Sequence, residues 1–230
     1  MKLIMWDIDS GGRNQIDSIV ENIRKENSDI VVLTGFRLNH NKRLIINSLK
    51  DIGYEHIIYK YVPNKHQDTV LIASREKFEV ENSKGSVNDS FLIIKNDDFY
   101  IAGMNFTHNL SQKDLVNIFK SKLNHLVDKK LIVTGNMQTA KNYASKNSLG
   151  KKFCKKYIDF KDMNLKNTLE TMTNYNPDEY SWVSKSGEEY NVDFILTSNK
   201  FDEECCYCYY NHDVKTSRVS SHSMIVFNNY

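Results

Sequence analysis

Short apolar runs alternate with longer polar segments along the chain, and the spacing of the apolar residues changes from one segment to the next. Residues 3–8 are apolar apart from Asp7 and are followed by an Asp-Ser-Gly-Gly segment, which predicts a buried strand and then a loop. Residues 14–25 carry isoleucine and valine at helical spacing, and residues 29–33 form a β-branched run typical of a second buried strand. Leucine and isoleucine over residues 44–49 predict another helix. The chain therefore begins with alternating strands and helices.

The second part of the chain has mostly strand patterns. Strands are predicted, with short polar connections, over residues 54–61, 69–73, 78–81, 90–95 and 99–106, and this succession favours antiparallel hairpins and a meander. A helix follows over residues 115–126 and a strand over residues 131–134, whereas residues 141–176 are polar and predict loops with one or two short helices. Strand patterns return over residues 180–183, 190–196, 204–210 and 224–227. Together these elements predict an α/β protein with two packed mixed sheets and outer helices.

Composition limits the classes of protein to consider. A chain of 230 residues is long enough for one large α/β domain, and two prolines and nine glycines mark no linker, so we expect a single domain over residues 1–230. Lys and Arg number 31 against 29 Asp and Glu, so nucleic-acid binding would need a local basic patch. No apolar stretch approaches the ~20 residues of a membrane span, and the opening apolar run is too short for a signal peptide. We therefore expect a soluble, cytoplasmic protein.

The four cysteines do not predict a metal site. Cys205 and Cys208 have C-x-x-C spacing, but they lie in a segment with a strand pattern, where residues three apart face opposite sides. No second pair occurs elsewhere. Reduced cysteines on a strand are therefore favoured over a structural zinc site.

Six short motifs follow one another in order along nearly the whole chain. They cover residues 5–9 (MWDID), 30–37 (IVVLTGFR), 105–108 (NFTH), 134–140 (TGNMQTA), 180–182 (YSW) with 192–196 (VDFIL), and 220–223 (SSHS). This ordered set resembles the endonuclease/exonuclease/phosphatase superfamily, which includes DNase I-like nucleases, abasic-site endonucleases, sphingomyelinases and inositol-phosphate phosphatases. The resemblance implies a four-layer α/β/β/α sandwich and metal-dependent hydrolysis of phosphodiesters.

The resemblance also implies roles for individual residues. In that superfamily a glutamate of the second motif is the main metal ligand, and the aspartate and asparagine of the fourth motif activate water and hold the phosphate. The final histidine, with an aspartate behind it, stabilises charge on the phosphate. By motif position, the catalytic residues here are His222, Asp193, His108, Asn136 and Gln138. The implied cofactor is Mg²⁺ or Mn²⁺, which prefer oxygen ligands.

Five positions lack the superfamily's residue, and one of them is Asn191, which stands where the superfamily has an arginine. Gly35 stands at the position of the metal-binding glutamate, and Ser221 at that of the aspartate before the final histidine. Asn136 stands at the water-activating aspartate, and an amide cannot accept a proton near neutral pH. Gln138 is one methylene longer than the phosphate-holding asparagine. The resemblance therefore predicts weakened metal binding and slow or absent hydrolysis.

One acid is gained in return, because Asp7 stands where the superfamily has asparagine. If residues 3–9 form a strand, Asp7 and Asp9 lie on the same face and could form a substitute cation site. Asp193 lies between apolar neighbours on its predicted strand, where a carboxylate needs a partner, and His222 is the obvious one. The ordinary alternative for His222, and for His108, is a histidine whose hydrogen bonds are satisfied without a chemical role.

Several cations are candidates for phosphate contacts. They are Arg13, Arg37, Lys141, Lys151 and Lys152, because arginine and lysine supply sequence-independent affinity for a phosphate backbone. A solvated lysine face is the alternative interpretation of the three lysines.

The sequence therefore predicts a nuclease-type phosphodiesterase by descent whose catalysis is impaired or lost. The alternatives are a non-catalytic protein that binds nucleic acid or protein, and a relative of phosphatases or lipid phosphodiesterases. No long hydrophobic insertion of the kind used at a membrane surface is present, and this favours a polyanion. Nucleic acid is the leading partner, and a phosphorylated small molecule or lipid is the next.

Overall fold

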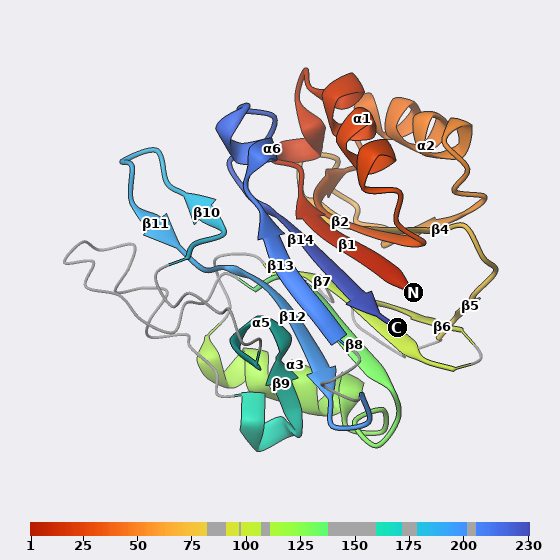
Figure 1. Ribbon diagram of the computed structural model, residues 1–230, viewed down its shortest axis with the longest axis vertical. Helices are drawn as coiled ribbons and strands as arrows, with labels where there is room; N and C mark the ends of the chain where they lie inside the picture. Colours follow the sequence, from red (N-terminus) through yellow and green to blue (C-terminus); the bar gives the residue numbers. More distant parts are fainter. Residues whose placement is uncertain (82–90, 97, 107–110, 138–159, 172–178, 202–205) are drawn as a thin grey trace.

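The computed structural model describes residues 1–81, 91–96, 98–106, 111–137, 160–171, 179–201 and 206–230 (Figure 1). Two six-stranded sheets pack face to face within these residues, and helices cover both outer faces. The predicted four-layer α/β/β/α sandwich is confirmed. No helix in the described part of the chain is long and apolar enough to cross a membrane.

The first sheet contains both ends of the chain. Its strands are β1 (Lys2–Asp7), β2 (Ile30–Arg37), β3 (His56–Tyr59), β4 (Asp68–Ser74), β13 (Cys206–Asn211) and β14 (Met224–Asn229), in the order β13-β14-β1-β2-β4-β3. Strands β1 and β2 are parallel, so the chain must cross over between them, and α1 (Ile16–Glu26) makes this crossover. Helix α2 (Asn41–Asp51) follows β2 and lies beside α1.

The second sheet is built from the middle of the chain. Its strands are β5 (Glu79–Val80), β6 (Phe91–Lys95), β7 (Tyr100–Asn105), β8 (Leu131–Asn136), β9 (Leu165–Asn167) and β12 (Asp193–Ser198), in the order β5-β6-β7-β8-β12-β9. Helix α3 (Gln112–Leu123) joins the parallel strands β7 and β8 and begins at a capping box formed by Ser111 and Asp114.

Shorter elements complete the described chain. These are the turns of helix η1 (Ser10–Gly12), η2 (Phe160–Met163), α5 (Thr168–Thr171) and α6 (Asp213–Thr216), and the hairpin of β10 (Trp182–Val183) and β11 (Glu189–Tyr190). Both η1 and α6 lie at one end of the first sheet, next to the end of β1 (Figure 1).

Three apolar layers follow from the two-residue period of the strands. In β1, Met5 faces the second sheet, whereas Trp6 faces α1 and α2. In β8, Ile132 faces the first sheet and Val133 packs in the layer that contains α3. Each strand therefore contributes alternate residues to the central layer and to one outer layer.

The same period brings polar residues together where the central layer ends. Asp7 follows Met5 by two positions, and Thr34 lies two positions beyond Val32 in the central layer. The last residue of β8, Asn136, and the first residue of β12, Asp193, are also buried on this side. The two sheets thus present buried polar groups to each other at one end of the sandwich.

Some expectations were wrong in detail. The expected meander is divided between the sheets, because β3 and β4 pair in the first sheet and β5, β6 and β7 pair in the second. Residues 190–196 form the end of β11 and most of β12 rather than one strand, and β9 was missed. Cys206 and Cys208 lie on β13, whereas Cys154 and Cys205 lie outside the described residues.

Candidate active site

A buried acid–amide pair connects the two sheets. Asn136 Nδ2 donates a hydrogen bond of 2.9 Å to Asp7 Oδ2, which also accepts one of 3.1 Å from Thr34 Oγ1. The other carboxylate oxygen of Asp7 accepts from the backbone N–H of Asp9 at 3.0 Å. Burial raises the pKa of Asp7, and the positive charge of His222 opposes this rise. Three donors therefore hold a carboxylate at the position where the superfamily has an amide.

A second buried pair is formed by His222 and Asp193. Nδ1 of His222 lies 2.7 Å from Oδ2 of Asp193, and their side chains are only 7% and 0% exposed. Burial lowers the pKa of His222, but the carboxylates of Asp193, Asp7 and Asp9 outweigh it and raise this pKa to about 9. The imidazole is therefore a cation at neutral pH, and Nε2 is its second donor.

Neighbouring groups fix the position of the His222 ring. Trp182 stacks on it with ring centroids 5.8 Å apart and an angle of 25° between the planes. The indole N–H of Trp6 donates to the backbone oxygen of His222 at 3.2 Å, and the His222 N–H donates to Ser220 Oγ at 3.1 Å. Both tryptophans thus support the site from within the protein.

Asp9 lies beyond the end of β1 and is bound by the segment before His222. Its carboxylate accepts from the backbone N–H of Ser221 at 2.7 Å and from the Ser221 hydroxyl at 2.9 Å. The indole of Trp182 donates to the same hydroxyl at 3.1 Å. A serine at position 221 therefore binds Asp9 directly, where an aspartate would face it with a like charge.

Asp7, Asp9 and His222 offer ligand atoms that all lie within 4.8 Å of one another. The two carboxylates fit Mg²⁺ or Mn²⁺, which prefer oxygen ligands. Protonated His222 is a poor ligand, because its Nδ1 is bound to Asp193 and a cation repels a metal ion. Asp7 and Asp9 are therefore the residues that would hold the ion.

Gly35 lies against the Asp7 carboxylate. Its φ is +64°, and a Cβ there would lie 2.3 Å from Asp7 Oδ1 and 3.1 Å from the backbone nitrogen of Asp9. The pairing of β2 with β4 shifts register around this residue, between Leu33 and Phe36. The space at position 35 is thus occupied by the carboxylate of Asp7, so the two departures at positions 7 and 35 are sterically linked.

The site as a whole is negative. When ionised, Asp7, Asp9 and Asp193 carry three negative charges, against the positive charge of His222 and that of Arg13, which lies 3.9 Å from Asp9. Oδ1 of Asp193 is buried and has no hydrogen-bond partner among the described residues. A phosphate group would be repelled by this excess of negative charge unless a cation neutralised it.

The other residues expected from sequence have different positions. Arg13 is 63% exposed and lies 3.9 Å from Asp9, whereas Arg37 is paired with Asp68 and is mostly covered. His108, Gln138, Lys141, Lys151 and Lys152 lie outside the described residues. The structure thus brings together the predicted residues of strands β1, β8 and β12 and of the segment before β14.

Sequence reasoning missed several hydroxyl groups that support the site. Ser181 Oγ accepts from the backbone N–H groups of Val192 and Asp193 at 3.0 and 3.2 Å. Ser220 Oγ donates to the backbone oxygen of Asp7 at 2.7 Å. Both serines lie inside the recognised motifs, but no pattern in the sequence marked their hydroxyl groups as supports of the site.

The arrangement of the whole chain is shared with solved nucleic-acid enzymes. An AP endonuclease from Archaeoglobus fulgidus is similar with a TM-score of 0.76 and 17% identity, over 100% of this chain and 99% of that one. A 3′ phosphatase from Neisseria, bound to product DNA hairpin, has a TM-score of 0.73 and 17% identity, over 100% and 99%. An AP endonuclease from Leishmania major has a TM-score of 0.74 and 12% identity, over 100% and 87%.

No protein-family model and no curated protein matches this chain by sequence. The chain has the DNase I-like fold of these structures, and its function has to be argued from its own site.

Proposed function

We propose that this protein binds the phosphodiester backbone of nucleic acid at the site of Asp7, Asp9 and His222, that binding requires Mg²⁺ or Mn²⁺, and that hydrolysis there is slow or absent. The hydrogen bond from Asn136 to Asp7 is the observation that carries the proposal. The resemblance implies that the residue at position 136 activates water, and an amide at this position supports the absence of hydrolysis. The Asp7 carboxylate beside it accepts hydrogen bonds from three donors. Among the described residues, the site keeps groups that bind phosphate, and position 136 offers an amide in place of a base.

Binding follows from the charges. Asp7 and Asp9 would hold the divalent ion, which would neutralise the carboxylates and attract a phosphate oxygen. Nε2 of His222 would donate to a second phosphate oxygen, with Asp193 keeping the ring oriented and charged. Without the ion, the same carboxylates repel the backbone.

Nucleic acid is favoured as the ligand by the neighbouring structures. AP endonucleases and a 3′ phosphatase bound to a DNA hairpin share the fold over the whole chain. These likenesses support a polyanionic ligand, and a phosphorylated small molecule is the runner-up.

The test measures binding and hydrolysis on the same samples. Fluorescent single-stranded and duplex DNA are titrated with protein in 5 mM Mg²⁺, in Mn²⁺ and in EDTA, and intact DNA is then quantified on a gel. We expect binding that is lost in EDTA, at least tenfold weaker binding by His222→Gln, and no cleavage above buffer. An exposed arginine, Arg43 on α2, serves as the control position, and Arg43→Gln should bind like the wild type.

Two results would contradict the proposal. Binding that is equal in EDTA and in His222→Gln would place the DNA elsewhere. Rapid Mg²⁺-dependent cleavage that His222→Gln abolishes would show that the altered site still activates water.

A further inference from the structure

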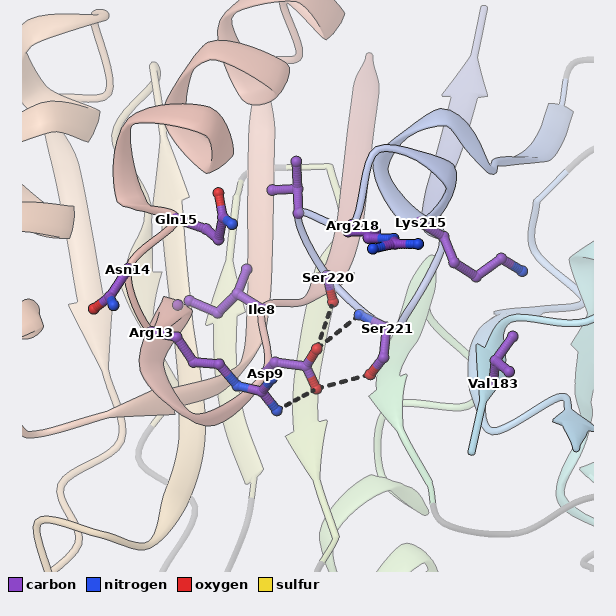
Figure 2. A pocket seen from close by; sticks show the side chains of 12 residues that line it. Ile8, Asp9, Arg13, Asn14, Gln15, Val183, Lys215, Arg218, Ser220 and Ser221 are labelled. Atoms are coloured by element: carbon purple, nitrogen blue, oxygen red, sulfur yellow. Dashed lines mark hydrogen bonds and ion pairs between the residues drawn. The ribbon is translucent and has the colours of Figure 1, made fainter. Parts of the chain in front are cut away.

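A large cavity adjoins the candidate active site on the far side of Asp9 and Ser221. Its volume is about 590 Å³, and its walls come from the loop that contains η1 and from the segment between α6 and β14. Figure 2 shows Arg13 on the η1 side, Lys215 and Arg218 on the α6 side, and Asp9 with Ser221 between them. Asp9 and Ser221 therefore line the cavity and also belong to the site described above.

The cavity walls are positive. Arg13, Lys215 and Arg218 line it, and Asp9 is the single carboxylate among its described lining residues. Arg13 is 3.9 Å from Asp9, which is a long ion pair, and Asp9 is already bound by Ser221. Arg218 is exposed and forms no ion pair within the described part of the chain. Two guanidinium groups thus remain able to bind an anion, and the planar donor fork of arginine matches a phosphate.

Lys215 contributes charge in a different way. Its Nζ lies 3.6 Å from the centre of the Tyr180 ring and donates to the backbone oxygen of Tyr180 at 3.2 Å. These contacts hold the ammonium group against Tyr180, which is not among the described residues that line the cavity. Lys215 therefore adds to the positive field of the cavity from a fixed position.

Backbone strain is concentrated at the same cavity. Asp9, Arg13 and Arg218 have φ values of 51°, 45° and 59°, and a positive φ is uncommon for residues other than glycine. The two arginines that face the cavity thus lie on backbone conformations that other residue types, glycine or asparagine, would adopt more easily. The fold keeps charged residues at strained positions on both sides of this cavity.

The cavity also has apolar walls and a suitable size. Ile8, Val183 and Val219 line it beside the polar groups. Its volume lies within the roughly 300–1,000 Å³ range typical of small-molecule sites, which accommodates a nucleotide. A ligand with one phosphate group and a flat apolar part fits both features.

We propose that this cavity binds a phosphomonoester on a nucleotide, with Arg13 and Arg218 as its phosphate ligands. Two sources share this chemistry, a terminal phosphate on a nucleic-acid strand and a free nucleotide. The first source rests on the proposed function, because the adjacent nucleotides of that strand would occupy the neighbouring site across Asp9 and Ser221.

The experiment compares ligands with and without the phosphomonoester. A fluorescent single strand of eight thymidine nucleotides (dT8), carrying a 5′-phosphate, a 3′-phosphate or neither, is titrated with the full chain in Mg²⁺. The affinities of thymidine 5′-monophosphate and thymidine are compared by calorimetry. We expect the phosphate to strengthen binding at least tenfold for phosphorylated dT8 over dT8, or for thymidine 5′-monophosphate over thymidine. Arg218→Asn should remove this difference in affinity. Asparagine suits a positive φ, so this variant should keep the thermal stability of the wild type. Arg43→Gln, which removes an arginine outside the cavity, should keep the full advantage.

The outcomes separate this proposal from the previous one. If dT8 binds in Mg²⁺ but no phosphomonoester strengthens binding, the cavity proposal is wrong and the proposed function stands. If no form of dT8 binds but thymidine 5′-monophosphate does and Arg218→Asn weakens it, the cavity proposal stands and the nucleic-acid function is wrong. Equal weakening of phosphorylated and unphosphorylated ligands by Arg218→Asn also overturns the cavity proposal.

Discussion

Asn136 on β8 donates a 2.9 Å hydrogen bond to Asp7 on β1 and so joins the two sheets of the sandwich at one end. The motifs of the resembling superfamily have an amide at position 7 and a carboxylate at position 136. Here the acid and the amide are exchanged, and the volume and total charge of the pair are unchanged. The carboxylate missing at position 136 and the one gained at position 7 therefore belong to the same buried pair, which still satisfies its hydrogen bonds.

This exchange predicts strong coupling between the two positions. Asn136→Asp alone would place two buried carboxylates at hydrogen-bond distance and should cost about 3 kcal/mol at pH 7. Asp7→Asn alone should cost about 1–2 kcal/mol, because an amide cannot accept from all three donors. The double variant restores an amide–acid pair and should lie within about 1 kcal/mol of the wild type. Urea unfolding of the four proteins measures this cycle, and additive costs would show that the pair is not coupled.

Gly35 predicts a second coupling. Gly35→Ala should destabilise the protein by more than about 2 kcal/mol, because the new Cβ meets Asp7 Oδ1 and φ is +64°. Gly187 is a matched control, since its φ is +81° and a Cβ there meets no atom within 4 Å. Gly187→Ala should therefore show the cost of the backbone conformation alone. In an Asp7→Ala background, the cost of Gly35→Ala should fall toward this control value, and an unchanged cost would exclude the steric link.

The fold could be predicted from sequence, and so could several residues that meet at the candidate site, but the contacts between motifs could not. The two-residue period correctly put Asp193 opposite its apolar neighbours, and motif order predicted its pairing with His222. The contact of Asp7 with Asn136 joins residues 129 positions apart, and no local pattern specifies such a contact. Asp9 approaches Asp7 through a turn with φ of 51°, because the strand ends at Asp7 and its period no longer applies.

The neighbouring cavity was beyond sequence reasoning for a related reason. Lys215 and Arg218 lie in and after a four-residue helix, where exposed polar residues follow no period. Their relation to Arg13 depends on how the first and last parts of the chain pack together. Only the three-dimensional arrangement shows that these cations share one cavity.

The acidic site predicts stabilisation by divalent ions. For a weak site with a Kd of about 1 mM, 10 mM Mn²⁺ would add about 1.4 kcal/mol, or roughly 3–6 °C in Tm. Asp7→Asn and Asp9→Asn should each lose most of this shift, because each removes one of the two candidate ligands. Asp51 is exposed on α2, and Asp51→Asn should keep the shift. Thermal unfolding in Mn²⁺ and in EDTA measures it, and a shift that persists in both site variants would place the ion elsewhere.

Lys215 predicts how phosphomonoester binding depends on pH. Burial lowers the pKa of Lys215 to about 8, although the carboxylates of Glu189, Glu179 and Asp193 act in the opposite direction. The second pKa of a phosphomonoester is about 6, so the group remains a dianion from pH 7 to pH 9. The charged ammonium of Lys215 attracts the phosphate dianion. The ratio of affinities for phosphorylated and unphosphorylated ligand should therefore decrease as the pH rises through 8.

The measurement is the ratio of affinities for phosphorylated and unphosphorylated ligand at pH 7, 8 and 9. Taking this ratio cancels the titration of His222, which belongs to the adjacent site and affects both ligands. Lys215→Arg keeps its charge over this range and should give a flat profile, whereas Lys215→Met should have a low ratio already at pH 7. A wild-type ratio that is constant from pH 7 to pH 9 would mean that Lys215 does not act on the bound phosphate.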